Sequence, residues 1–220
     1  QTYGLQQNKY HTWDVWGHIL KVVENTRTDL HLRMAALLHD IGKINTRTVD
    51  DNGNVHFYKH ELVSAEMCDT ILRRLKYSND FIRTVQILVK NHMRTKNWSD
   101  NCNHMKDKTL RKMQYELGDN MMKCLELIDA DNKAHAIEYR MPNQVRNIIK
   151  RLEQFKEEGI SMENYKLPVN GDDVMEVLGI EPCAKVKECL NWLLKFTFNN
   201  PKISREELLK NIKQFRNDKK

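Results

Sequence analysis

The sequence predicts an all-α protein. Glycine and proline are scarce, with 8 and 4 residues among 220, and runs in which β-branched and polar residues alternate are also scarce. Apolar residues instead recur three and four positions apart, which is the spacing of one helix face. Charged residues make up 30% of the chain, which suits helices with long solvated faces. Few strands or none are therefore expected.

Short polar signals separate the expected helices. Gly42 follows an apolar run, as a glycine at a helix C-terminus does, and Asp51-Asn52-Gly53 is a turn signal. Ser204 and Glu207 form a capping box for the last helix. The expected helices cover roughly residues 10–26, 28–41, 60–76, 78–93, 107–117, 119–137, 140–157, 171–179, 183–198 and 204–216.

Charge and cysteine content limit the class of protein. The net charge of +6 is consistent with a polyanionic partner or an anionic substrate, such as nucleic acid or a nucleotide, and equally with a solubility role alone. The five cysteines are odd in number and have no CxxC spacing, which indicates a reduced cytoplasmic protein. No apolar run approaches the ~20 residues of a membrane span, and no signal peptide is found, so no membrane partner is expected.

Polar residues occupy positions that should be buried in the first two helices. His11 and His18 are seven residues apart with apolar residues between them, so they are expected on one inward face. The second helix is apolar all round at residues 34–38, which indicates a central helix. His39 and Asp40 follow on its last turn, about 100° apart. A histidine and an aspartate are therefore expected in the core.

Three later residues extend this set. His60 begins its helix and can face inward, and His92 is the last member of an apolar stripe. The helix over 119–137 carries two aspartates. Asp131 lies on the inner stripe, whereas Asp129 lies on another face and can pair with Lys133 at i, i+4. Asp131 is therefore the expected inward carboxylate.

Taken singly, an inward histidine is more often a core residue than a metal ligand. Here four histidines and two aspartates point inward from five helices, and buried carboxylates are costly unless something compensates them. A cluster of divalent cations compensates such a set. Imidazole and carboxylate ligands suit Mn, Fe, Co, Ni or Zn, and Mg less well.

The order His18, His39-Asp40 and Asp131, with the string HDIGK, resembles the HD superfamily of metal-dependent phosphohydrolases. His60 and His92 resemble the form of the motif that holds two metals. The resemblance implies an HD-domain helical bundle. In it, His18, His39, Asp40 and Asp131 would hold one ion, His60 and His92 a second, with Asp40 bridging both or fixing the first.

A longer resemblance covers most of the chain. It is to the HD-containing C-terminal half of bacterial CCA-adding tRNA nucleotidyltransferases, and its stretches are YHTWDVWGHILKVVENT, LRMAALLHDIGK, DDNGNVHFYKHELVSAEMCDTILRRLKYSND and KLPVNGDDVMEVLGIEP. It implies an HD domain over residues 1–138 and a helical extension over 139–220, a smaller tail. The glycine-rich, paired-aspartate motif of a nucleotidyltransferase head is not found in this sequence, so nucleotide addition is not carried over. Cys183-Ala184 replaces an expected glycine and proline, which puts the tail's function in doubt.

The resemblance implies hydrolysis of phosphoesters, with 2′,3′-cyclic nucleotides favoured over other nucleotides and small phosphate esters. A metal-bound water of lowered pKa would be the nucleophile. Asp40 and Lys43 are the expected catalytic residues. Lys43 and Arg94 are candidate substrate contacts, although Lys43 also suits a helix C-terminus. His135 is either a partner of the ligands or a core residue. The remaining histidines are expected to be structural or on the surface: His11, His31, His56 and His104.

Two other functions stay open. One is a tRNA- or RNA-binding module in which the HD site is structural, which the basic C-terminal helix favours. The sequence is also compatible with a hydrolase of guanosine tetraphosphate or of deoxynucleoside triphosphates, because the HD superfamily includes such enzymes. Metal identity and number, the physiological substrate and the oligomeric state do not follow from the sequence.

Overall fold

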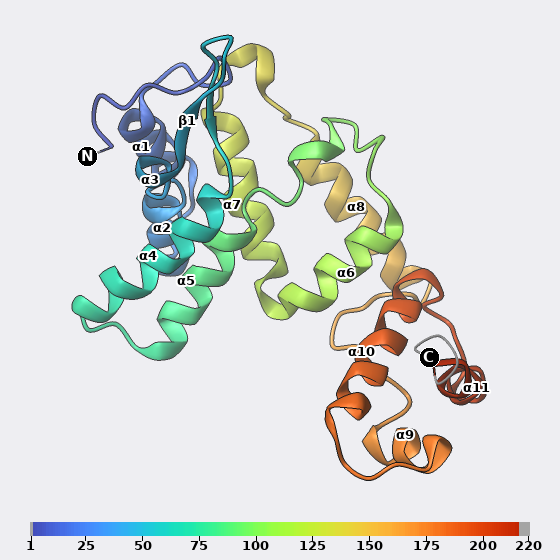
Figure 1. The fold of residues 1–220 in the computed structure, drawn as a ribbon. Helices are drawn as coiled ribbons and strands as arrows, with labels where there is room; N and C mark the ends of the chain where they lie inside the picture. Colours follow the sequence, from blue (N-terminus) through green and yellow to red (C-terminus); the bar gives the residue numbers. More distant parts are fainter. Residues whose placement is uncertain (1, 216–220) are drawn as a thin grey trace. The chain divides into compact units, whose positions relative to one another are not determined.

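The computed structural model describes residues 2–215 and confirms the all-α prediction (Figure 1). A two-stranded antiparallel sheet and three short 3-10 helices accompany the α-helices. No helix among residues 2–215 is long and apolar enough to cross a membrane. The elements are α1 (Val15–Asn25), α2 (Leu30–Leu38), α3 (Lys43–Thr46), β1 (Arg47–Val49), β2 (Val55–Phe57), α4 (His60–Arg74), α5 (Asn79–Asn91), η1 (Lys96–Trp98), α6 (Asp107–Leu117), η2 (Gly118–Asn120), α7 (Met121–Ala134), η3 (Ile137–Tyr139), α8 (Gln144–Glu157), α9 (Gly171–Leu178), α10 (Ala184–Asn199) and α11 (Arg205–Phe215).

The chain forms two compact units. Unit 1 contains the residues up to Met105 together with Asp119–Lys150, and unit 2 contains Lys106–Gly118 together with the residues from Arg151 onward. The division between residues 138 and 139 stays a prediction, because compactness does not show which part of a chain folds alone.

The core of unit 1 surrounds α2. This helix packs against α1, α4, α5 and α7, and α1 also packs along α7. Apolar side chains from these helices are fully buried between them, among them Ile19, Leu32, Val85, Leu88 and Leu125. A helix that is apolar all round is buried all round, which explains why α2 is central and why the residues that follow its C-terminal end lie in the core.

The first helix begins later than expected. Asp14 caps it, since its Oδ1 accepts a hydrogen bond of 2.7 Å from the backbone N–H of Gly17. Residues 10–14 therefore precede the helix, and the expectation that His11 shares a helical face with His18 is wrong. His11 reaches the same region from a loop.

The second helix ends at Leu38, so His39 and Asp40 lie in the turn that leads to α3 rather than on a last helical turn. Gly42 allows this turn to approach α4 closely. A Cβ at Gly42 would lie 2.6 Å from the backbone oxygen of His60. The first turn of α4 thus packs directly on the turn and places His60 beside Asp40.

The turn signal at residues 51–53 connects β1 and β2, which pair with Thr48 opposite His56. Asp50 Oδ1 accepts hydrogen bonds from the backbone N–H groups of Asn52 and Asn54, which orders the turn. Strands of three residues are too short to show an alternating pattern in the sequence.

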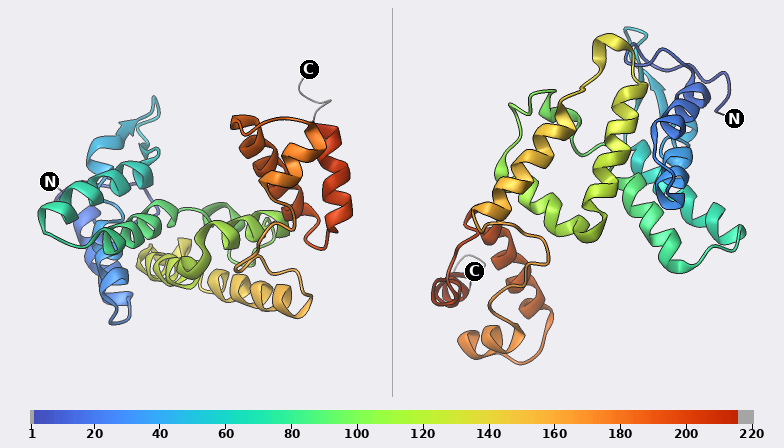
Figure 2. Two further views of the ribbon diagram at one scale, coloured as in Figure 1. Left: turned by 90° about the horizontal axis from the view of Figure 1, so that it is seen from below. Right: turned by 180° about the vertical axis from the view of Figure 1, so that it is seen from behind.

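Unit 2 has its own apolar core. The orange and red helices α9, α10 and α11 lie together in both views of Figure 2 and bury side chains such as Leu193 and Phe215. The expected capping box is confirmed, because Ser204 N–H donates to Glu207 Oε2 and Glu207 N–H donates to Ser204 Oγ. Residue 216, the expected end of the last helix, lies outside the described residues.

Candidate metal centre

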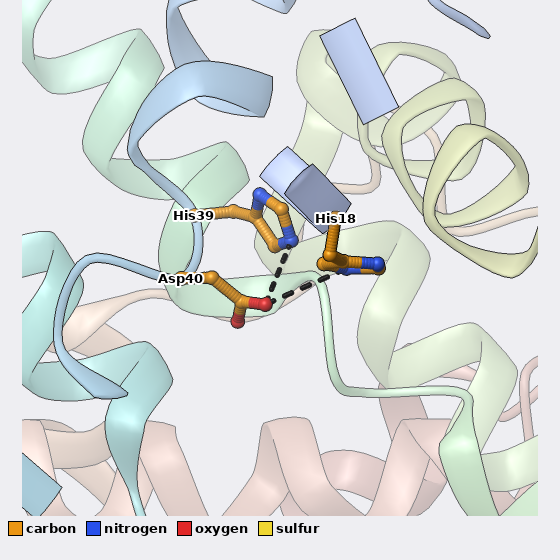
Figure 3. A group of neighbouring side chains, drawn as sticks. All are labelled: His18, His39 and Asp40. Carbon is orange, nitrogen blue, oxygen red and sulfur yellow. Dashed lines mark ion pairs between the residues drawn. The ribbon is translucent and has the colours of Figure 1, made fainter. Parts of the chain in front are cut away.

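Asp40 lies at the middle of a buried cluster of histidines in unit 1. Its Oδ2 is 3.3 Å from His39 Nε2 and 3.5 Å from His18 Nε2 (Figure 3). Its Oδ1 is 3.2 Å from His60 Nε2 and 3.8 Å from His92 Nε2. All five side chains are buried. Each carboxylate oxygen therefore faces a different pair of imidazoles.

Asp131 adds a second carboxylate from α7. Its Oδ1 is 3.0 Å from His18 Nε2 and 4.0 Å from His39 Nε2. Asp129 instead forms an ion pair of 2.6 Å with Lys133 Nζ on the outer face of the same helix, which confirms that pairing. The structure thus brings together all six side chains that the sequence predicted as ligands.

Three of these histidines are held by the same backbone arrangement. The ring Nδ1 of each donates to the carbonyl oxygen three residues earlier, and Nε2 then faces Asp40. The pairs are His39 with Ala36 at 2.7 Å, His60 with Phe57 at 2.8 Å and His92 with Val89 at 2.6 Å. Such a bond fixes the tautomer and leaves the Nε2 lone pair available to a metal ion.

The charges within the cluster keep both carboxylates ionised and His92 neutral. Burial lowers the pKa of His39, but the neighbouring Asp40 more than reverses this shift, so the pKa of His39 lies above its ordinary value. Burial raises the pKa of Asp40, but the neighbouring His39 and Lys43 more than reverse it, so its pKa lies well below the ordinary value. Burial raises the pKa of Asp131 too, and His135 and His18 reverse the shift. Burial, reinforced by the nearby imidazoles, lowers the pKa of His92 to about 3. Ionised carboxylates beside neutral imidazoles are the states that bind divalent metals.

The residues present fit a metal centre. His18 Nε2 and His39 Nε2 are buried without a hydrogen bond of good geometry, although carboxylate oxygens lie near both. Buried polar atoms of this kind normally have a partner. Two groups offer ligand atoms within 4.8 Å of one another, and both contain Asp40: one with His18 and His39, the other with His60 and His92. The donor set is nitrogen and oxygen only, which suits divalent transition metals. The number and identity of the ions stay predictions.

A cavity of about 470 Å³ opens over the cluster. Asp40, His60, His92 and Asp131 line it, and Lys43 does as well. Lys43 is almost fully buried, with Nζ 2.7 Å from Asp40 Oδ2 and 2.6 Å from Gln7 Oε1. The structure therefore places the predicted Lys43 in the site. Volumes of this size are common for small-molecule sites.

Arg94 is not among the described residues that line this cavity, and its Nη1 donates to Asn91 Oδ1. Lys96, two residues further on, lines the cavity instead, with Nζ 2.9 Å from His135 Nε2. Sequence reasoning missed Lys96 because it belongs to η1, which has no periodic pattern.

Two further histidines also line the cavity: His11, which was expected to be structural or on the surface, and His135, which was left open as a partner of the ligands or a core residue. The His11 ring lies 4.5 Å from the His18 ring and 4.9 Å from the His135 ring, between centroids. His135 Nε2 is 3.8 Å from Asp131 Oδ1, and burial lowers the pKa of His135 to about 4. His135 shares the inner stripe of Asp131 at i+4, which was the available sequence signal.

Comparisons with known proteins found a matching family model and several similar proteins. A family model described as HD domain matches residues 9–152. The A-adding tRNA nucleotidyltransferase of Deinococcus radiodurans is 40% identical over 96 residues, which are 41% of this chain and 22% of that protein. The CC-adding tRNA nucleotidyltransferase of Thermus thermophilus is 27% identical over 198 residues, or 87% of this chain and 43% of that protein. The multifunctional CCA protein of a Janthinobacterium species is 39% identical over 79 residues, or 34% of this chain and 18% of that protein. The chain thus spans less than half the length of each of these relatives.

Proposed function

The chain belongs to the HD domain family, and on this premise we propose that it hydrolyses phosphate esters of nucleotides or small molecules with the help of divalent metal ions. The observation that carries the proposal is the pair of ligand groups that share Asp40 beneath the cavity. Among phosphoesters, 2′,3′-cyclic nucleotides are the favoured substrates.

The two ligand groups support a division of the predicted ligands between two metal ions. His18, His39, Asp40 and Asp131 would hold one ion, and Asp40 with His60 and His92 would hold a second. Bound divalent ions supply Lewis acidity, which acidifies water and offsets negative charge on phosphoryl oxygens. The carbonyl oxygens that bind each Nδ1 keep the rings of His39, His60 and His92 aimed at these positions.

Two lysines would bind and orient the phosphate group. Lys43 Nζ is held by Asp40 and Gln7 at the cavity wall, where an ammonium group can contact a phosphoryl oxygen. Lys96 Nζ donates to His135 Nε2, which keeps its charge directed at the same cavity. In a partly closed cavity, two such cations favour a dianionic or monoanionic ligand over a neutral one.

Metal content and hydrolysis test the proposal together. Protein purified without chelators or a metal-affinity tag is analysed for bound elements and assayed with Mn²⁺ or Ni²⁺ against bis-p-nitrophenyl phosphate and 2′,3′-cyclic AMP. Two metal equivalents with hydrolysis support the proposal, whereas one equivalent assigns His60 and His92 to another role. Absence of metal, or of hydrolysis across a broad panel of phosphoesters, contradicts it. Asp40→Ala is expected to abolish hydrolysis and keep the helical circular-dichroism spectrum.

RNA binding is a second candidate, favoured by one observation. The similarity to the CC-adding enzyme extends over 198 residues, so it is not confined to the part that the HD domain model matches. That relative is, by its name, a tRNA nucleotidyltransferase. If this chain binds tRNA, the affinity should fall steeply with salt, because phosphate contacts release counterions. An affinity that does not depend on salt, or no binding at 50 mM salt, contradicts this candidate.

A further inference from the structure

The mouth of the cavity carries exposed aromatic rings that metal binding does not use. Tyr58 is 69% exposed, Tyr10 41% and Tyr139 36%, and all three line the cavity. Large aromatic side chains gathered at the mouth of a charged cavity commonly mark a ligand site. They come from three separate segments: the loop before α1, the end of the hairpin, and η3. The chain therefore assembles this rim from distant parts of the sequence.

The rings are arranged in two pairs. His56 and Tyr58 stack with an interplanar angle of 10° and centroids 5.1 Å apart. Tyr10 and Tyr139 meet edge to face at 78°, with centroids 4.8 Å apart. An aromatic pair of either geometry still leaves ring faces uncovered, and a flat conjugated ligand prefers to lie on such a face.

The hairpin fixes one of these pairs. His56 Nε2 lies 3.0 Å from Asp50 Oδ2, and Asp50 also accepts from the backbone and side chain of Asn54. Asp50 thereby orients the imidazole of His56, and Tyr58 stacks on it. A ring that is held before the ligand arrives loses less entropy on binding. Tyr58 therefore presents a prepared surface and is more than an incidental exposed tyrosine.

Resting on the proposed function, we infer that this rim binds the base of a nucleotide substrate, with the base stacked on Tyr58 and lying between the two aromatic pairs. The phosphate would then reach Lys43 and Lys96 below, so base and phosphate contacts are separated along one cavity. Stacking does not read the edges of a base, since every base has a π-face. The site is therefore expected to select nucleotides over base-free esters, with little preference between adenine and guanine.

Substrate selectivity tests the inference. The ratio of kcat/KM for 2′,3′-cyclic AMP to that for glycerol 1,2-cyclic phosphate is measured in wild type, Tyr58→Ala and Tyr58→Phe. Loss of one stacking partner is expected to lower the ratio by about tenfold, mainly through KM, whereas the phenyl ring of Tyr58→Phe restores it. Tyr3→Ala is the matched control, because Tyr3 is 82% exposed and is not among the described residues lining the cavity. An unchanged ratio in Tyr58→Ala overturns the inference.

Binding separates the inference from the proposed function. Adenosine, which has no phosphate, is examined by saturation-transfer NMR with wild type and with Tyr58→Ala. Transfer to the base protons that disappears in Tyr58→Ala supports the base site even if the protein hydrolyses no ester. Hydrolysis of esters without any adenosine binding keeps the proposed function and rejects the base site.

Discussion

Gly42 donates its backbone N–H to the Ser64 hydroxyl at 2.9 Å, which ties the His39-Asp40 turn to α4. The approach is close because glycine has no side chain. A Cβ at this position would lie 2.6 Å from both the Ser64 nitrogen and the His60 carbonyl oxygen. These are backbone atoms, so a side-chain rotation cannot relieve the clash. The contact sets the separation between Asp40 and His60, which belong to different elements.

Gly42→Ala is therefore expected to destabilise the protein by about 2 kcal/mol, as overpacking of a buried site does, and to weaken metal binding. Urea denaturation measures the first effect and isothermal titration with Mn²⁺ the second. Gly171→Ala is the matched control, because its nearest neighbour would be a side-chain methyl group of Val186 at 3.4 Å, an ordinary van der Waals distance. If Gly42→Ala is as stable as wild type and binds metal equally well, the close approach does not position the site.

Metal binding should stabilise the folded state. A ligand at 100 times its Kd adds about 2.7 kcal/mol when it binds only the folded protein, so Mn²⁺ should raise Tm and a chelator should lower it. Asp131→Asn is expected to remove most of this rise, since Asp131 lies 3.0 Å from His18. Asp129→Asn is the control on the same helix, because Asp129 pairs with the surface residue Lys133 at 2.6 Å, and this variant should keep the rise. Equal Tm shifts in the two variants contradict the assignment of Asp131 as a ligand.

Helical periodicity found the residues of the centre that lie on helices or directly at their ends. His18 and Asp131 are on helical stripes, His60 begins α4, and His92 caps α5. Their inward direction follows from the apolar residues one turn away. The same reasoning placed His39 on the last turn of a helix, whereas α2 ends at Leu38. The prediction that His39 is buried still holds, because the turn keeps its side chain in the core.

Periodicity gave no information on the residues that reach the cavity from loops. His11 lies before α1, Lys96 lies in η1, and Tyr58 follows a three-residue strand. Their positions depend on how the loop before α1, the hairpin and η1 pack over the ligand cluster. This packing is a property of the whole unit, and a window of neighbouring residues does not contain it. The six clustered side chains and Lys43 were thus predictable from the sequence, whereas the residues that reach the cavity from the loops were not.

Lys96 should matter for the phosphate group. A charge-assisted hydrogen bond in a partly closed cavity contributes about 1.5–3 kcal/mol, so Lys96→Ala should raise KM for 2′,3′-cyclic AMP by at least roughly tenfold. Inorganic phosphate should also become a weaker competitive inhibitor, which a loss of stability alone would not cause. Lys90→Ala is the control, because Lys90 is exposed on the last turn of α5. Unchanged inhibition by phosphate in Lys96→Ala contradicts the proposed contact.

The pair Asp107 and Arg151 should make unit 2 sensitive to acid. The guanidinium donates from Nε to Asp107 Oδ1 at 3.0 Å and from Nη2 to Oδ2 at 2.5 Å. These hydrogen bonds outweigh burial and lower the pKa of Asp107. A carboxyl whose pKa is lowered by folding stabilises the protein above its unfolded pKa of about 3.9, and the stabilisation disappears as pH falls through the folded pKa.

Arg151→Met is therefore expected to be less stable than wild type at pH 6 by up to about 1 kcal/mol, since the pair is partly exposed, and the difference should shrink as the pH falls below 4. Carboxyl NMR titration should show the pKa of Asp107 rising toward the ordinary value in the variant. Arg146→Met is the control on the same helix, because Arg146 is exposed and contacts the neutral Asn143. A stability difference that persists unchanged to pH 2 would assign the effect to the packing of Arg151 on the Phe155 ring rather than to its charge.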